Sequence, residues 1–384
     1  MRLSSRLPES HAPNALARAL ARRRQAGLEV LDLTLSNPTV AGFRAPEQVR
    51  EALAAPEVLG YAPDAAGSLA ARSAVAAYHG AGVDPDSVLL TASTSEAYAW
   101  LFKAVGDPGD EILVPSPSYP LFEWLARLEG LAAKVVPDCF HEGWNPDPAS
   151  LEAAWGPRAR ALVVVNPNNP TGQYLSPGAW EGLTAFCARR GLLLIVDEVF
   201  SAYALEAPPD RIRSVLALPE PPCPVAVLSG LSKVALLPQV KLGWMILRGP
   251  GAERLREGLE FIADQFLPVS ASAQAAAKSA LGAGPALRSR VLARARENLA
   301  TLDRGLSDRP HLQRLRVEGG WSVILRRPAI GSDEACALHL LEACGVLVHP
   351  GHFFDIAREG FLVLSLLTPE DVFEAGLARA LPLL

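Results

Sequence analysis

The sequence predicts an α/β protein, with a mostly parallel central sheet in a large domain and a smaller α+β domain. Residues 86–250 alternate short apolar runs with amphipathic stretches, which is the pattern of βαβ units. After about residue 250 the pattern changes to a helix-rich stretch over 253–306, followed by short strand-like runs. The 384 residues also exceed one typical domain. We therefore expect a large domain over 45–280 and a small domain formed by 1–44 and 281–384.

Short apolar runs predict the strands of both domains. In the large domain they lie at 88–91, 111–114, 132–136, 161–165, 192–196, 225–228 and 244–247. In the small domain they lie at 315–317, 322–325, 346–348 and 362–366. Helical spacing predicts helices at 14–25, 96–105, 119–128 and 177–190. Because buried parallel sheets bind ligands beyond the carboxyl ends of their strands, we look for the functional residues there.

Composition narrows the class of protein. A net charge of −5 argues against a nucleic-acid footprint or a polybasic membrane surface. No apolar stretch approaches the roughly 18–20 residues of a membrane span. The five cysteines are scattered without metal-ligand spacing, so we expect reduced thiols, no metal site and a cytoplasmic location. The arginine- and alanine-rich start of the chain could be read as a transit peptide, but its helical spacing favours an ordinary helix.

Lys233 and Asp197 carry the strongest chemical signal. Lys233 ends a run of small residues that begins at Ser229, and Asp197 follows the apolar run 192–196. Pyridoxal phosphate (PLP) chemistry needs this combination, because an amine forms a Schiff base with the aldehyde and a carboxylate keeps the pyridine nitrogen protonated. An aspartate in this place could equally be a helix N-cap.

Three further segments follow predicted strands. The small hydroxyl residues around Thr94 and Ser95 open a helix, where they could bind a phosphate or form an ordinary N-cap. Tyr119 follows a proline-rich turn, and its ring could serve as a flat binding surface or belong to the core. Lys241 could place a second cation near a phosphate or be a surface lysine.

The run from Asn166 to Gly172 is more elaborate than a turn requires. Its two Asn-Pro bonds form a stiff loop in which a cis bond can occur. An amide held there, such as that of Asn169, can donate to a phenolate oxygen.

From Leu33 to its C-terminus the chain resembles the fold-type I PLP enzymes, and within them the class I/II aminotransferases. The Asn-Pro-Thr-Gly run, the Asp-Glu-Val segment and the Ser-Lys segment occur in family order. The intervals from Asn169 to Asp197 (28) and from Asp197 to Lys233 (36) are also similar to those of the family. The resemblance implies the PLP-dependent transferase fold and PLP as cofactor.

The resemblance also implies roles for single residues. Lys233 would form the Schiff base and shuttle the proton, and Asp197 would pair with the pyridine nitrogen. The other cofactor-binding residues would be Thr94 and Ser95 at the phosphate, Tyr119 on the ring face and Asn169 at the ring hydroxylate, with Lys241 in place of the usual phosphate arginine. Tyr61 matches a tyrosine that reaches the phosphate of the neighbouring subunit, which implies a homodimer with shared active sites.

The activity implied is transfer of an amino group from an amino acid or related amine to a 2-oxo acid, with ping-pong kinetics. Fold does not decide which bond breaks, so two alternatives stay open. One is a PLP-dependent carbon–sulfur β-lyase or decarboxylase. The other is a non-catalytic PLP-binding protein.

Two departures from the family pattern concern the cofactor. Phe200 stands where a tyrosine usually donates to the ring hydroxylate, and Tyr203 is a candidate substitute. Gly230 replaces a hydroxyl residue, which leaves Ser229 or the backbone to bind the phosphate.

A third departure concerns the substrate. Val363 stands where the family has an arginine that binds the substrate α-carboxylate, and a neutral side chain cannot replace that arginine. Either another residue binds the carboxylate, or the substrate lacks one. Arg358 is the nearest arginine in sequence, and Arg44 and His352 are further candidates for the pocket.

Overall fold

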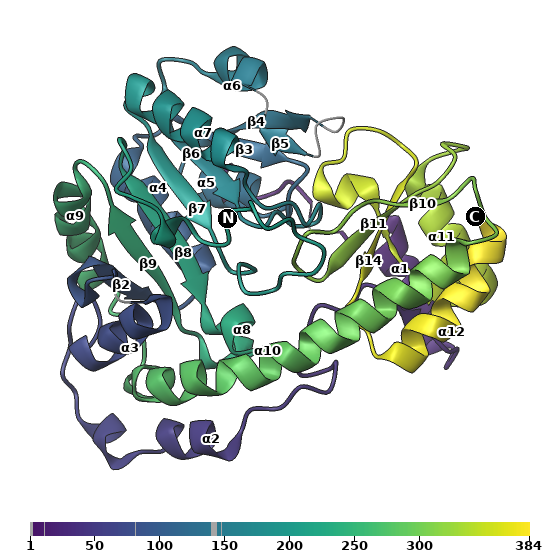
Figure 1. Cartoon of the computed structure of the whole chain (residues 1–384), viewed down its shortest axis with the longest axis horizontal. Helices are drawn as coiled ribbons and strands as arrows, with labels where there is room; N and C mark the ends of the chain where they lie inside the picture. The colour runs from purple at the N-terminus through teal and green to yellow at the C-terminus, as the bar shows by residue number, and fades with distance from the viewer. Residues whose placement is uncertain (1–2, 11, 81, 140–143, 147) are drawn as a thin grey trace.

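The computed structural model describes residues 3–10, 12–80, 82–139, 144–146 and 148–384. Within them the chain forms a large lobe around an eight-stranded sheet and a smaller lobe around a four-stranded sheet (Figure 1). The domain boundaries at 44/45 and 280/281 stay predictions.

The large sheet has the strand order β2-β9-β8-β7-β6-β3-β4-β5. Its strands are β2 (Val88–Thr91), β3 (Glu111–Ser116), β4 (Ala132–Cys139), β5 (Asn145–Pro146), β6 (Ala159–Val165), β7 (Leu193–Asp197), β8 (Val225–Gly230) and β9 (Gly243–Arg248). Neighbouring strands from β4 through β3, β6 and β7 to β8 are parallel, whereas β9 runs antiparallel to β8 and β2. All seven strands predicted for this sheet are confirmed, and β5 is an additional short edge strand.

Helices cover both faces of this sheet. Along β7, Leu194 and Val196 pack into the core shared with α7 (Pro177–Arg190), whereas Leu193 and Ile195 pack into the core shared with α4. This division follows from the alternation of side chains along a strand. The remaining helices of this lobe are α2 (Glu47–Leu53), α3 (Leu69–His79), α4 (Thr94–Val105), α5 (Phe122–Leu128), α6 (Pro148–Ala154), α8 (Leu231–Val234) and α9 (Ala252–Asp264).

The small lobe has an antiparallel sheet of order β10-β11-β14-β13. Its strands are β10 (Gln313–Arg314), β11 (Ser322–Arg326), β13 (His349–Pro350) and β14 (Phe361–Ser365), and β1 (Leu31–Asp32) pairs with β12 (Val346–Leu347) outside it. Helices α1 (Ala15–Gln25), α11 (Asp333–Cys344) and α12 (Glu370–Ala380) pack around these strands.

The predicted strand at 315–317 is wrong, because β10 ends just before it. The segment instead bonds to a loop of the large lobe: the Glu206 N–H donates to the Val317 carbonyl (3.2 Å), and the Leu205 N–H donates to the Glu318 carbonyl (2.9 Å). Leu315 still donates its N–H to the Ile324 carbonyl of β11 (2.9 Å), whereas the carbonyls of Val317 and Glu318 are used between the lobes.

The helix-rich stretch after residue 250 is two helices, α9 and α10 (Ala271–Leu306), separated by a segment that contains Pro268. The first half of α10 packs into the core of the large lobe and the second half into that of the small lobe, with Pro285 near the crossover (Figure 1). A Cβ at Gly284 would lie 2.8 Å from the Val234 carbonyl oxygen, so glycine lets α10 approach α8. Over the described ranges, no helix combines the length and apolarity required to cross a bilayer.

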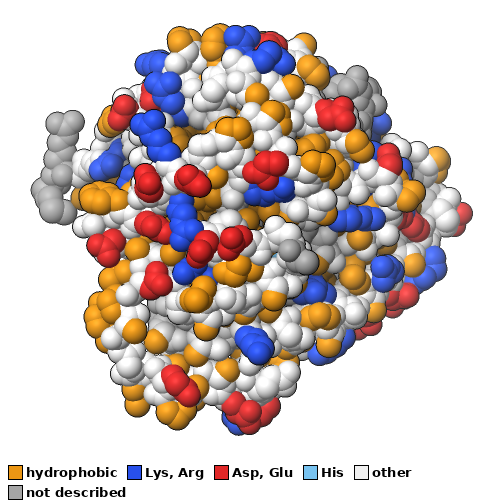
Figure 2. Space-filling model, turned by 60° about the vertical axis from the view of Figure 1, so that its left-hand side comes forward, with side chains coloured by type: hydrophobic (Ala, Val, Ile, Leu, Met, Phe, Trp, Pro, Cys, Tyr) orange, Lys and Arg blue, Asp and Glu red, His pale blue; other side chains and the backbone are white. Residues whose placement is uncertain are grey.

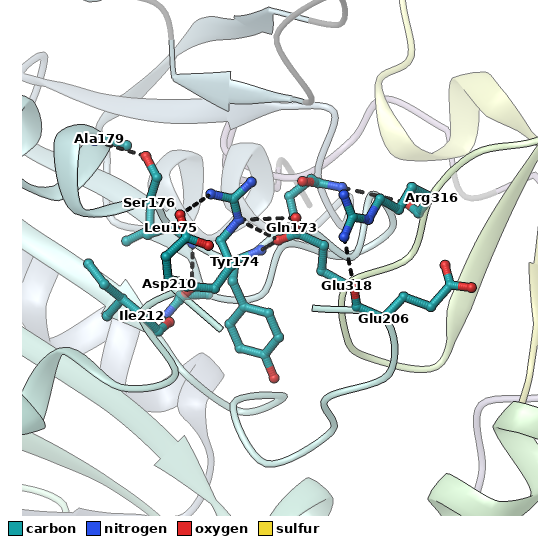
Figure 3. Close-up of polar contacts among 12 residues, drawn as sticks. Gln173, Tyr174, Leu175, Ser176, Ala179, Glu206, Asp210, Ile212, Arg316 and Glu318 are labelled. Carbon is teal, nitrogen blue, oxygen red and sulfur yellow. Dashed lines mark hydrogen bonds and ion pairs between the residues drawn. The ribbon is translucent and has the colours of Figure 1, made fainter. Parts of the chain in front are cut away.

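A buried carboxylate joins the two lobes. Glu318 follows the small-lobe strand β10, and its side chain is 1% exposed. Both of its carboxylate oxygens accept from Arg211 Nε at 3.0 Å, and Oε2 also accepts from the Tyr174 N–H at 3.1 Å. Figure 3 shows Glu318 between Tyr174 and Glu206 at this junction. Removing the carboxylate would leave the Arg211 guanidinium buried without its main partner.

We expect Glu318→Ala to lower the free energy of unfolding by about 3 kcal/mol, because breaking a mostly buried pair leaves an uncompensated charge. Urea unfolding followed by circular dichroism measures this loss. Glu297→Ala is the matched control, since Glu297 pairs with Arg304 at the surface (56% and 63% exposed). That change should cost less than about 1 kcal/mol. Equal losses in the two variants would contradict a stabilising role for the buried pair.

Candidate active site between the lobes

A cavity of about 330 Å³ lies at the carboxyl ends of β6 and β7, between the two lobes. Seven of the eight predicted site residues line it: Thr94, Ser95, Tyr119, Asn169, Asp197, Lys233 and Lys241. Tyr61, the eighth, is 85% exposed and lies outside it. Residues separated by more than a hundred positions in sequence are thus brought to one site.

Asp197 ends β7 and is 8% exposed. Its Oδ2 accepts from the Tyr98 hydroxyl at 3.0 Å, and its Oδ1 accepts from the Val199 N–H at 3.0 Å. Burial raises the pKa of this carboxyl to about 6, while those two hydrogen bonds and the charge of Lys233 act in the opposite direction. No helix begins here, so the N-cap interpretation is wrong. A cationic ring nitrogen would favour the ionised carboxylate.

Lys233 lies on α8, directly after β8, and faces two aromatic rings. Its Nζ is 4.8 Å from the ring centroid of Trp321 and 5.5 Å from that of Phe200. Burial lowers the pKa of the amine to about 8, and the Asp197 charge partly opposes this. Tyr203 donates its hydroxyl to the Lys233 carbonyl (2.5 Å) and does not line the cavity, so it does not replace the donor missing at Phe200.

The start of α4 forms an anion cradle. The Ser93 Oγ accepts from the Glu96 N–H (3.2 Å), and the Glu96 carboxylate accepts from the Ala92 N–H (2.6 Å), so these two side chains cap the helix. The hydroxyls of Thr94 and Ser95 have no partner within the described part of the chain. They remain available to a phosphate at the positive end of the helix.

Close backbone packing supports this cradle. A Cβ at Gly243 would lie 2.9 Å from the Ser93 carbonyl carbon, so glycine lets β9 pass beneath the start of α4. Lys241 adopts a left-handed conformation (φ 58°) just before that strand and lines the same end of the cavity. Ser229 is buried and does not line the cavity, whereas Ser232 does, so the expectation placed on the Ser229 side chain is wrong.

The three asparagine side chains of the 166–172 loop form different hydrogen bonds. Asn166 accepts from the Leu175 N–H (2.9 Å) and donates to the Ile212 carbonyl (3.0 Å), and Asn168 donates to the Pro117 carbonyl (3.1 Å). These bonds fix the loop, in which both Asn-Pro bonds are cis. Asn169 accepts from the Ser322 hydroxyl (3.1 Å), which leaves its NH₂ group free to donate into the cavity.

Tyr119 lines the cavity as a half-exposed ring, 6.5 Å from the ring of Phe354, and not as a core residue. It precedes α5, because the predicted helix at 119–128 begins only at Phe122. The hydrogen bond from the Ser118 N–H to the Phe354 carbonyl (3.0 Å) holds this turn against the small lobe.

The small lobe supplies a wall without an arginine. Val363 lines the cavity and is 2% exposed. Arg44, Arg358 and His352 are exposed, and none of them lines the cavity. The residue that sequence reasoning missed is His349, which does line it and is paired with Val363 across β13 and β14. Only the register of those strands could have indicated it.

The donor set fits PLP. The α4 cradle and Lys241 suit its phosphate, Asp197 its ring nitrogen, Asn169 its ring hydroxylate and the Lys233 amine its aldehyde. The free hydroxyls of Thr94 and Ser95 and the free amide of Asn169 are the observations on which this fit rests.

Comparison with known proteins gives the same picture. The family model for aminotransferase class I and II matches residues 29–376. The chain is 33% identical to the alanine aminotransferase of Mycobacterium tuberculosis over 282 residues, which are 71% of this chain and 65% of that protein. It is 30% identical to the aspartate/prephenate aminotransferase of Thermus thermophilus, over 99% of this chain and 98% of that protein.

Solved structures extend the likeness to the whole fold. The alanine aminotransferase from Pyrococcus furiosus superposes with a TM-score of 0.87 at 27% identity, covering 98% of both chains. A Thermus thermophilus aspartate aminotransferase mutant superposes with a TM-score of 0.86 at 29% identity and full coverage of both chains. The fold is thus that of the aminotransferases, and the chain belongs to the class I and II aminotransferase family.

Proposed function

We propose that the protein is a PLP-dependent aminotransferase that moves an amino group from an amino acid or related amine to a 2-oxo acid in a ping-pong reaction. The observation that carries this proposal is the meeting of Lys233 and Asp197 in one cavity with an anion cradle. The relatives named above transfer amino groups according to their names, which supports the same reaction class here.

When bound, PLP supplies an aldehyde for the amino group and a ring that accepts electrons from the substrate α-carbon. Lys233 is the group that would attach the cofactor. Asp197 is the counter-ion that would keep the ring nitrogen protonated. Asn169 would donate to the ring hydroxylate, and no hydroxyl at Phe200 assists it.

When it is not attached to the cofactor, the Lys233 amine would act as the general base that takes the α-proton of the substrate and as the general acid that returns it. Its position between Trp321 and Phe200 suits this task, because apolar surroundings favour the neutral, basic form of the amine. The Tyr203 hydroxyl holds the Lys233 carbonyl and so positions the short helix that carries the amine.

We also propose that the protein acts as a cytoplasmic homodimer with shared active sites. Tyr61 is exposed and does not line its own cavity, which supports its assignment to the site of a partner subunit. Leu59, Phe261 and Phe266 are further large apolar side chains with high exposure. Figure 2, which turns the left-hand side of Figure 1 forward, shows hydrophobic side chains among the charged ones on this face. Such exposure is typical of interaction surfaces.

A visible absorbance spectrum of the purified protein tests the function. We expect a cofactor band that an amino donor converts to the spectrum of the aminated cofactor, because the nitrogen stays behind when the donor leaves as a carbonyl compound. Release of pyruvate and ammonia from a β-substituted amino acid would instead indicate a lyase. Absence of any band after PLP is added would contradict the proposal.

Lys233→Ala should lower kcat by about 10²- to 10⁴-fold, since it removes the general acid and base. Steady-state kinetics with the best donor measure this loss. Lys278→Ala is the matched control, because Lys278 is an exposed lysine outside the cavity, and this variant should keep the wild-type rate. Wild-type kcat in Lys233→Ala would remove that residue from the mechanism.

The lowered pKa of Lys233 predicts a pH-dependent stability of the cofactor-free protein. Between about pH 8 and 10.5 the unfolded chain binds a proton at this amine and the folded chain does not, so its contribution to the free energy of unfolding rises with pH. The rise is at most about 1.4 kcal/mol per pH unit. Urea unfolding of wild type and Lys233→Met at pH 8, 9 and 10 checks it. Parallel pH profiles for the two proteins would contradict the shift.

A further inference from the structure

We infer that the small-lobe wall of the cavity selects amino donors whose reacting carbon carries an uncharged group in place of a carboxylate, and that His349 and Val363 set this preference. The inference rests on the proposed aminotransferase activity and narrows its substrate class.

The first argument is a count of hydrogen-bond donors on this wall. Three hydroxyls that line it already donate within the protein: Thr34 to Asp32 Oδ1 (2.6 Å), Ser365 to the Leu35 carbonyl (2.5 Å) and Ser322 to Asn169 Oδ1 (3.1 Å). Within the described residues, the side-chain groups of this wall that remain free to bind a ligand are those of Ser36 and His349 and the indole N–H of Trp321. All three are neutral, so none supplies the positive charge with which proteins usually bind a carboxylate.

The second argument is charge. The cations that line the described cavity are Lys233 and Lys241, and both are assigned to the cofactor. Val363 and Phe354 make the rest of the wall apolar, and both are buried. A carboxylate placed there would be desolvated without a fixed counter-ion, which is costly.

The third argument is the position of His349. β13 pairs it with Val363 on β14, and its ring lies 5.7 Å from the rings of both Phe353 and Phe354. Burial among these groups lowers the pKa of the imidazole and so favours its neutral form, although Asp32 partly opposes the shift. A neutral imidazole offers one donor and one acceptor, which suits an amide, a hydroxyl or an ester.

The reaction with such a donor balances in the usual way. The donor would lose its α-proton to Lys233 and its nitrogen to the cofactor, and it would leave as an aldehyde or ketone whose oxygen comes from water. A 2-oxo acid acceptor would meet the same wall. Its KM should therefore be higher than that of an uncharged aldehyde acceptor.

The test compares L-alanine with L-alaninamide, which have similar shapes but differ in charge. Added separately to the holoenzyme, each is followed through conversion of the cofactor spectrum in a single turnover. We expect the amide to have at least about a tenfold higher kcat/KM, because one desolvated charge is typically worth that much. Equal or better reaction of L-alanine would overturn the inference while leaving the aminotransferase proposal intact.

A binding measurement separates the two proposals. Propionamide should bind the holoenzyme at least about tenfold more tightly than propionate in calorimetric titrations. If neither alanine nor its amide reacts, the binding pair still decides the preference of the wall, and the aminotransferase proposal is judged by the absorbance test with other donors. Tighter binding of propionate would overturn the inference.

Two substitutions test whether Val363 and His349 set the preference for uncharged donors. Val363→Arg should reverse it toward L-alanine, with Val135→Arg, at an exposed position of β4, as the control. His349→Leu should lower kcat/KM about tenfold for alaninamide and leave it unchanged for isopropylamine, which lacks a group to bond. The exposed His352→Leu should change neither. Equal losses with both amines in His349→Leu would show a merely structural role and overturn the assignment, even where Val363→Arg fails to fold.

Discussion

A buried carboxylate and a buried amine at one cavity impose the main constraint on this molecule. Each would be costly alone, since burial raises the pKa of Asp197 and lowers that of Lys233, and each charge favours the other. Neighbouring groups stabilise and position these two side chains. Tyr98 and the Val199 N–H bind the carboxylate, and Tyr203 fixes the backbone of the amine. The parallel strands β7 and β8 bring both to the same edge of the sheet.

The strands predicted in the large sheet could be recognised because they are short apolar runs, of which β7 is buried along its whole length. Several cavity-lining residues could be predicted because they lie at or shortly after the end of such a run, as Asp197 lies at the end of β7. The segment 315–317 could not, since its strand-like composition reflects packing between the lobes and not a ladder.

The roles of other residues depend on contacts in the folded chain that cannot be read from the sequence. His349 reaches the cavity only through its register with Val363, and its neighbour His352 faces solvent. Ser229 is buried and does not line the cavity, although the adjacent Gly230 does. The Tyr203 hydroxyl bonds to a carbonyl thirty residues away along the chain. In each case the placement of the side chain in the fold, and not the residue type, decides whether it contributes to the site.

Helix α10 links the two lobes to the segment that carries Lys233. Its first half belongs to one core and its second half to the other, and at the crossover Gly284 and Arg288 touch the carbonyl of Val234, the residue after Lys233. A displacement of α10 would therefore be transmitted through the Arg288–Val234 hydrogen bond to the short helix that carries the amine. The position of Lys233 thus depends on a helix that belongs to both cores.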